Sequence, residues 1–147
     1  MVKSSCQSSV TIVKFMQRKK GEMVWDPAPD IHTELTYLVE RLKFEYIDAR
    51  RLVCFRSFGS TSRARARIWS LPKVWQLALK VEAHYVVEVL SEKFDHLSQD
   101  DQKRVLIHEL MHIPKSFSGA LVPHRGRYHA IDHHTVERLF RQYLMNK

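Results

Sequence analysis

Residues 98–114 read SQDDQKRVLIHELMHIP, and this stretch decides the fold. Ser98 and Asp101 have the S-x-x-D form of a capping box, and two acids fall in the first turn, where the helix dipole favours them. Apolar residues then recur at helical spacing until Pro114 ends the pattern. The stretch therefore predicts an amphipathic helix over about 99–113.

Within this helix, residues 108–112 form an HExxH motif, His-Glu-Leu-Met-His. Residues i and i+4 lie one turn apart on one face, so His108 and His112 can both reach one tetrahedral zinc ion. Glu109 lies about 100° round the helix, close enough to contact a water on that ion without being a ligand. It is the candidate general base of a metal-assisted hydrolysis. The alternative is two surface histidines on an ordinary helix.

A catalytic zinc ion usually has a third protein ligand. The metzincin extension HExxHxxGxxH is excluded, because Lys115 stands where glycine is required and Ser118 where the third histidine should be. Glu137 would make the site gluzincin-like, and Asp132 would make it resemble the Asp-ligand zincins. Histidine candidates are His124, His129, His133 and His134. The residues alone leave these alternatives open.

The flanking sequence predicts further helices and strands. Strands are expected over 51–58, 63–71 and 84–90, with the turn-like GSTS between the first two. Residues 75–81 fit either a helix or a strand. Helices are expected over about 31–43, capped by Asp30, and over about 135–145, capped by Asp132.

These elements predict one α+β domain with a minimal zincin-like fold. A small twisted sheet of about three or four strands packs on the HExxH helix, between an N-terminal and a C-terminal helix. A chain of 147 residues is long enough for one core and too short for two ordinary domains. We place the domain over 25–147. Residues 1–24 are expected to be a basic, partly flexible segment in which VTIVKFM could add a strand or a short helix.

The formal charge of +8 is concentrated in the middle of the chain, where residues 49–81 carry eight basic residues and no acid. Alternation over 63–67 would project Arg63, Arg65 and Arg67 from one face of a strand. Such a basic region can attract nucleic acid, an anionic membrane surface or an acidic polypeptide, or it can be an ordinary solvated face.

The composition and the first residues suggest a cellular location. No window approaches the roughly 18 apolar residues of a membrane span, so we expect no membrane partner. The first ten residues lack the apolar region of a secretory signal, and we therefore expect a cytoplasmic protein. Cys6 and Cys54 have no CxxC pairing and are interpreted as free thiols.

Three stretches carry a resemblance to a known family: SRARARIWSLPKVWQ (62–76), YVVEVLSEKFDHL (85–97) and IHELMHIPKSFSGALVPHRG (107–126). They resemble small metallopeptidases of archaea, archaeal viruses and bacteriophages. They are also similar to the SprT-like proteases, in which a third zinc ligand lies in a Pro-His-Gly segment after the HExxH helix. The resemblance covers roughly residues 50–143.

This resemblance implies a zinc metallopeptidase, an endopeptidase acting on a protein or peptide substrate. It implies that His108 and His112 are the first two zinc ligands, Glu109 the general base and His124 the third ligand. Arg125 departs from the pattern by separating His124 from Gly126, and the four-Cys zinc ribbon of longer SprT-like proteins is absent. By analogy with SprT-like proteases, which act on proteins near DNA, nucleic acid is a candidate partner of residues 49–81.

Two other functions fit the same residues. One is a nucleic-acid-associated binding protein with a structural or vestigial zinc site, which closed four-ligand coordination would favour. The other is a zinc hydrolase that acts on a non-peptide amide, because attack on any amide carbonyl uses the same groups. For the peptidase, the sheet edge beside the HExxH helix could hold an extended peptide by strand addition. Arg125 and Tyr128 are further candidate contacts with substrate or nucleic acid.

Overall fold

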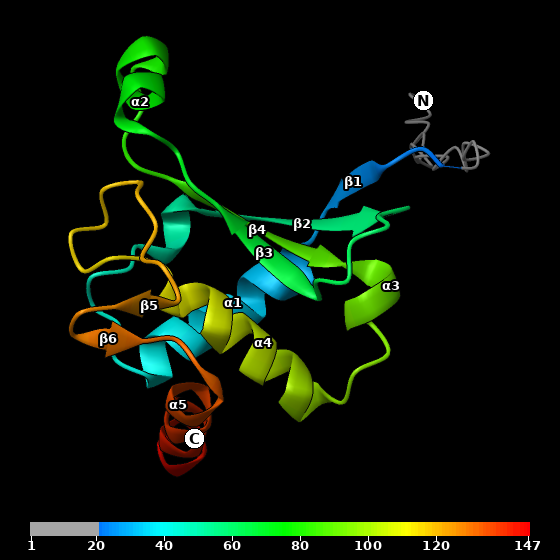
Figure 1. Ribbon diagram of the computed structural model, residues 1–147, viewed down its shortest axis with the longest axis vertical. Coiled ribbons are helices and arrows are strands. Elements are labelled where there is room, and N and C mark those ends of the chain that lie inside the picture. Colours follow the sequence, from blue (N-terminus) through cyan, green and yellow to red (C-terminus); the bar gives the residue numbers. More distant parts are fainter. Residues whose placement is uncertain (1–20) are drawn as a thin grey trace, which may run out of the picture.

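The computed structural model describes residues 21–147, so the VTIVKFM stretch and Cys6 lie outside the described part of the chain. It confirms the predicted α+β architecture (Figure 1). A four-stranded sheet forms one layer, and α1 (Pro29–Arg41) and α4 (Gln99–Met111) cover one of its faces. The last helix, α5 (His133–Met145), packs against α4.

The sheet has the strand order β1-β2-β4-β3. Its strands are β1 (Val24–Pro27), β2 (Leu52–Phe58), β3 (Ala66–Trp69) and β4 (Tyr85–Leu90). β2 and β4 are parallel, whereas β1 pairs antiparallel with β2 and β3 pairs antiparallel with β4. The two strands on either side of GSTS therefore do not pair with each other, because β4 lies between them.

The third strand is shorter than the alternating sequence predicts. β3 begins at Ala66, and the residues before it form local turns in which Ser60 Oγ accepts the N–H of Ser62 and Ser62 Oγ accepts that of Ala64. Such side-chain bonds compete with strand pairing. The alternation from Arg63 to Arg67 therefore lies mostly outside the strand.

Two features near the start of the domain differ from the sequence prediction. Val24–Pro27 forms an edge strand that the sequence analysis does not predict, and an edge position tolerates proline. Asp30 does not cap α1, since the N-cap is Ala28. The Asp30 carboxylate instead accepts hydrogen bonds from Arg56, at 2.8 and 3.2 Å.

The remaining elements complete the domain. The ambiguous segment forms a helix, α2 (Lys73–Leu79). A short 3₁₀ helix, η1 (Ala49–Arg51), precedes β2, and α3 (Ser91–Phe94) follows β4. The hairpin of β5 (Arg125–Gly126) and β6 (His129–Ala130) connects the loop after α4 to α5.

The predicted N-caps of α4 and α5 are both present. Ser98 Oγ accepts the N–H of Asp101 at the start of α4. Asp132 accepts the N–H of Thr135, whose hydroxyl in turn accepts the N–H of Asp132, which is a capping box on α5. These bonds satisfy backbone donors that the first turn of a helix leaves free.

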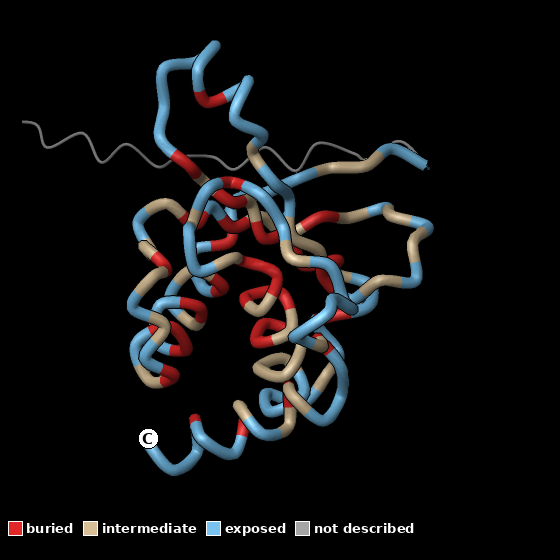
Figure 2. The backbone as a smooth tube through the Cα atoms, turned by 60° about the vertical axis from the view of Figure 1, so that its left-hand side comes forward, coloured by how far each residue is buried: buried red, intermediate tan, exposed pale blue. Residues whose placement is uncertain are grey.

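The core lies between the sheet and the helices, and Figure 2 shows the buried residues gathered there. Burying apolar side chains is the main force that holds such a domain together. Cys54 is one of these buried residues and is a free thiol, as predicted. No helix of residues 21–147 is both long enough and apolar enough to cross a membrane. Fully buried core side chains come from α1, β4, α3 and α4: Leu35, Leu38, Tyr85, Val87, Val89, Phe94, Leu106, Ile107 and Leu110.

Candidate metal centre

Three histidines from two segments converge at the C-terminal end of α4. His108 lies in the last turn of this helix, His112 is its C-cap residue, and His124 comes from the loop that leads to β5. Their ligand atoms all lie within 4.8 Å of one another. The Nε2 atoms of His108 and His124 are separated by 3.1 Å. The structure therefore brings His124, of all the downstream candidates, to the two motif histidines.

The three imidazoles fit a zinc ion. Two nitrogens that each lie about 2.0–2.1 Å from a tetrahedral ion are separated by about 3.3 Å, which is close to the observed spacing. Burial and the neighbouring imidazoles lower the pKa of His108 from 6.5 to about 4. Burial also lowers the pKa of His112. Both rings are thus neutral near pH 7, as metal ligation requires.

Glu109 lies beside this triad and is almost completely buried, with 7% of its surface exposed. Burial raises the pKa of its carboxyl group from 4.5 to about 7, although the N–H of Ile68 in β3 hydrogen-bonds to it and opposes the rise. A carboxyl group with a pKa near 7 can both accept and release a proton under physiological conditions. Its position on α4 next to His108 is the one that the HExxH motif predicts.

The backbone of Val122 holds His112 in place. The ring of His112 donates from Nδ1 to the carbonyl oxygen of Val122 at 2.6 Å. The N–H of Val122 donates to the carbonyl oxygen of His112 at 2.7 Å. Because Nδ1 carries the proton, Nε2 keeps its lone pair for a metal ion.

The loop that contains Val122 is itself anchored by the buried Tyr85. The Tyr85 hydroxyl accepts the N–H of Gly119 and donates to the carbonyl oxygen of Ala120, both at 2.8 Å. Gly119 has a φ of +90°, and a Cβ there would lie 2.3 Å from the carbonyl oxygen of Leu71, so only glycine fits.

Gln76 provides a second anchor for this loop. Its amide donates from Nε2 to the carbonyl oxygens of Leu71 and Ser118, at 2.8 and 2.7 Å. Sequence reasoning missed Gln76, Tyr85 and Val122. Tyr85 looks like an ordinary apolar strand residue, and Val122 acts through main-chain atoms that leave no sequence signal.

The other ligand candidates are engaged elsewhere. Asp132 caps α5, and Glu137 pairs with Arg104 at 2.9 Å. The Nε2 atom of His129 lies 3.0 Å from the carbonyl oxygen of Pro123, and its ring lies against Gly126. His133 and His134 are exposed at the start of α5.

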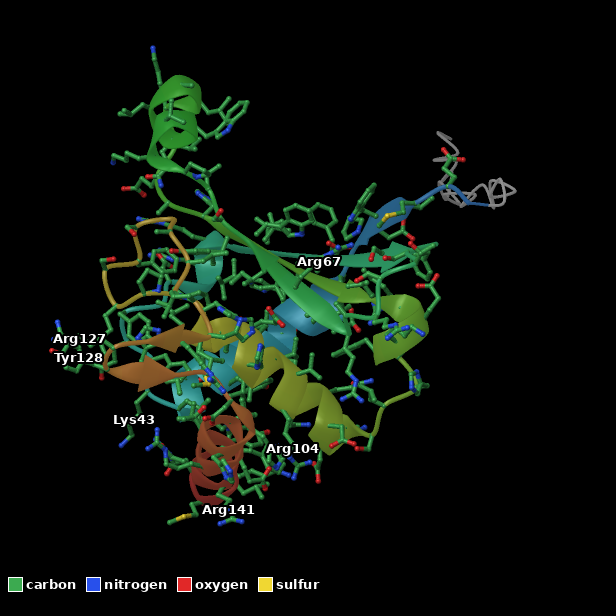
Figure 3. The ribbon with its side chains drawn as sticks, in the orientation of Figure 1. Lys43, Arg67, Arg104, Arg127, Tyr128 and Arg141 are labelled. Atoms are coloured by element: carbon green, nitrogen blue, oxygen red, sulfur yellow. The ribbon has the colours of Figure 1, made fainter. Side chains whose placement is uncertain are left out.

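Half of the basic residues over 49–81 contact carboxylates. Arg67 donates from Nε and from Nη2 to the fully buried Glu88, at 2.9 and 3.2 Å, and lies over the sheet (Figure 3). Arg63 and Arg65 are exposed, so the three guanidinium groups do not form one solvated row. The carboxylate pairs are Arg50–Asp48, Arg51–Glu82, Arg56–Asp30 and Arg67–Glu88.

Arg125 and Tyr128 belong to the β5–β6 hairpin after His124. Both are exposed, and Tyr128 has 89% of its surface exposed. Figure 3 shows Tyr128 and Arg127 pointing out from the hairpin into solvent. Tyr128 is therefore not a packed aromatic side chain.

A groove of about 520 Å³ adjoins the triad, between the start of β3 and the N-terminal ends of α4 and α5. His108 and Glu109 form one end of it. Its other lining residues are small, apolar or charged, together with one histidine: Ala64, Arg65, Ala66, Asp101, Arg104, Val105, Asp132, His133 and Val136. A ligand in this groove would therefore lie next to His108 and Glu109.

Comparison with known proteins identifies a family. The model of a family described as "Putative phage metallopeptidase" matches residues 23–143. No curated protein and no solved structure shows significant similarity to the chain.

Proposed function

Because this chain belongs to the phage metallopeptidase family, we propose that it is a zinc-dependent endopeptidase. In this proposal His108, His112 and His124 hold the metal and Glu109 is the general base. The observation that carries the proposal is the convergence of three imidazoles beside one buried carboxyl group. Three histidines leave the fourth position of a tetrahedral ion for water or substrate, as catalytic zinc sites do.

A zinc ion held by His108, His112 and His124 would polarise the substrate carbonyl and lower the pKa of a water molecule. Glu109 would accept a proton from the attacking water and deliver this proton to the amine that leaves when the peptide C–N bond breaks. Burial places the Glu109 carboxyl group beside the three imidazoles and, in the metal-free protein, raises its pKa to about 7. His112, held by Val122, keeps its ring orientation during the reaction.

The outer edge of β3 provides a place for an extended peptide. The carbonyl oxygen of Arg65 accepts the N–H of Leu90 in β4. Because successive residues of a strand point their backbone groups to opposite sides, Ala66 and Ile68 direct theirs to the outer edge. This edge lies beside Glu109, so strand addition would place a scissile bond near the triad.

The decisive experiment measures zinc content and cleavage of fluorescein-labelled casein together. The wild type is expected to bind one zinc ion and to lose activity when a chelator removes it. Glu109→Gln should keep the zinc ion but lower kcat at least about a hundredfold, because a general base contributes about 10²–10⁴. Retained activity in Glu109→Gln would remove Glu109 as base, and zinc binding without cleavage by the wild type would favour a structural site.

Nucleic acid is the partner of the alternative proposal. The exposed Arg63 and Arg65 support it, since both precede β3 on the basic segment. Binding of a labelled DNA duplex should then weaken in Arg63→Ala/Arg65→Ala, and the salt dependence of binding should become shallower. Lys93→Ala/Lys115→Ala is the matched control, because both lysines are exposed and lie outside this segment.

A further inference from the structure

Helix α2 exposes its apolar side chains and buries only Gln76. Val74, Trp75, Leu77 and Leu79 have 68, 56, 67 and 58% of their surfaces exposed, whereas Gln76 is 5% exposed. At 100° per residue, the four apolar side chains cover roughly 200° of the helix circumference. A surface helix normally does the opposite and turns its apolar stripe to the core.

This orientation is fixed by hydrogen bonds. The Gln76 amide holds the polar side of α2 against the carbonyl oxygens of Leu71 and Ser118. Figure 1 shows α2 projecting from the end of the sheet, and the same projection is exposed along most of its length in Figure 2. A contiguous exposed apolar surface of this kind marks an interaction site.

The surroundings of α2 are basic. Lys73 begins the helix and Lys80 follows its end, and both are exposed. The first acidic residue after α2 in the sequence is Glu82, and its carboxylate already pairs with Arg51 at 2.5 Å. A partner that matches both properties carries apolar side chains flanked by carboxylates. A second copy of this chain matches poorly, because each chain carries a formal charge of +8.

The position of α2 relative to the metal centre indicates which partner this is. At Ile68, the outer edge of β3 lies beside Glu109. After Trp69, the last residue of β3, the chain continues to Lys73, where α2 begins. Five residues span at most about 18 Å, so α2 begins within that distance of Ile68. About six residues of an extended substrate on the side of α2 would cover this distance.

We propose that α2 is an exosite that binds an apolar, acidic segment of an unfolded protein substrate while the scissile bond lies at the metal centre. This inference rests on the proposed peptidase function and adds a substrate class to it. Side chains of the substrate pack against Trp75 and Leu77, and its carboxylates lie near Lys73 and Lys80. Tryptophan is among the residues that contribute most to binding at such contacts.

The first experiment separates binding from catalysis. Glu109→Gln protein is titrated with fluorescently labelled, reduced and carboxymethylated α-lactalbumin, which is unfolded and acidic. Adding Trp75→Ser/Leu77→Ser should weaken this binding about tenfold, because truncating a central apolar contact commonly costs a factor of this size. Leu144→Ser/Met145→Ser is the matched control, since both residues are exposed apolar side chains on α5. Unchanged binding in the α2 variant would overturn the exosite whether or not the chain is a peptidase.

The second experiment compares substrates in the active protein. Trp75→Ser/Leu77→Ser should raise KM for carboxymethylated α-lactalbumin and leave cleavage of a six-residue quenched peptide within about twofold. Lys73→Glu/Lys80→Glu should reduce the preference for this substrate over reduced, carboxamidomethylated lysozyme, which is unfolded and basic. If Trp75→Ser/Leu77→Ser lost the same fraction of activity on the short peptide as on the protein substrate, the exosite would be contradicted. A wild type that binds unfolded protein through α2 but cleaves nothing would refute the peptidase and keep the binding surface.

Other occupants of α2 would give different results. Sedimentation that shows a dimer of the wild type and a monomer of Trp75→Ser/Leu77→Ser would assign the surface to a second copy of the chain. Binding to phosphatidylglycerol vesicles or to a DNA duplex that depends on Trp75 and Leu77, without binding to α-lactalbumin, would assign it to a membrane or to nucleic acid. Each of these results overturns the exosite.

Discussion

The Nε2 atoms of His108 and His124 lie 3.1 Å apart, although the two residues are on different sides of a long loop. Two imidazole nitrogens this close either share a proton in a hydrogen bond or face a common cation. The pair therefore supports the proposal that His124 is the third ligand of a zinc site.

We predict that His124→Ala loses bound zinc while His96→Ala keeps it. His124 supplies one of three nitrogens, so its removal leaves an incomplete set of ligands, whereas His96 is exposed on the segment before α4. Metal analysis of the purified proteins checks this. Zinc retained in His124→Ala, together with zinc lost in a variant of His129, His133 or Glu137, would assign the third ligand elsewhere.

Asp132→Ala tests whether the acid before α5 is a ligand or a cap. Because its side chain accepts the N–H of Thr135, we predict a lower Tm and unchanged zinc content. Asp132→Asn should restore most of the Tm, since asparagine is also a good N-cap residue. Zinc loss in both variants would show that the carboxylate binds the metal.

Tyr85→Phe should weaken zinc binding without removing any ligand. The substitution keeps the ring in the core but leaves the N–H of Gly119 and the carbonyl of Ala120 without their partner, so the loop to Val122 and His124 loosens. Removal of such outer contacts typically lowers metal affinity by about 10- to 100-fold.

Competition with a zinc chelator measures this change, and the visible spectrum of the cobalt-substituted protein reports whether ligand geometry changes with it. Tyr143→Phe is the control, because Tyr143 is equally a buried tyrosine but lies on α5. If both variants bind zinc as tightly as the wild type, Tyr85 supports the fold and does not position the ligands.

Arg67→Ala should destabilise the domain by about 2–3 kcal/mol at pH 7. It would leave the buried Glu88 carboxylate without its charged partner, and the usual cost of 3–5 kcal/mol for such a loss is reduced here because Arg67 is about one-third exposed. Arg65→Ala, a change at an exposed arginine two residues away, should stay within about 0.5 kcal/mol of the wild type. Urea unfolding measures both, and equal stabilities would show that Glu88 needs no cation.

The same ion pair predicts a dependence on pH. Burial opposes ionisation of Glu88, but the hydrogen bonds from Arg67 and Trp69 outweigh it and hold the pKa of Glu88 below 4.5. The unfolded chain therefore takes up this proton first as the pH falls, so the stabilisation is complete above the ordinary carboxyl pKa and is lost below it. The difference in unfolding free energy between wild type and Arg67→Ala should shrink below about pH 4.5. A constant difference down to pH 3 would contradict this linkage.

The features that the sequence predicts well are local ones. The HExxH helix and its Ser98 cap, the Asp132 cap and the strand over 84–90 all depend on residues within one or two turns of each other. The position of β4 between β2 and β3 is not local, because it depends on packing of the whole sheet. GSTS has turn composition whether or not its neighbouring strands pair.

In the candidate site, too, the residues placed by local geometry were predicted and those placed by distant contacts were not. His108, Glu109 and His112 follow from helix geometry, and the residues alone gave several options for the third ligand. His124 is separated from the motif by a loop whose course depends on Tyr85 and Gln76, side chains far away in sequence. The outward orientation of α2 also escapes prediction, because a single hydrogen-bonded glutamine decides which side faces the domain.

The contact that orients His112 uses only the peptide groups of Val122. Any residue with a main-chain N–H can serve there, so evolution can exchange the side chain at this position freely, with proline as the exception. Selection acts here on the length and course of the loop, not on the identity of its residues. Distant homologues could therefore preserve this support of the metal centre without having any amino acids in common around position 122.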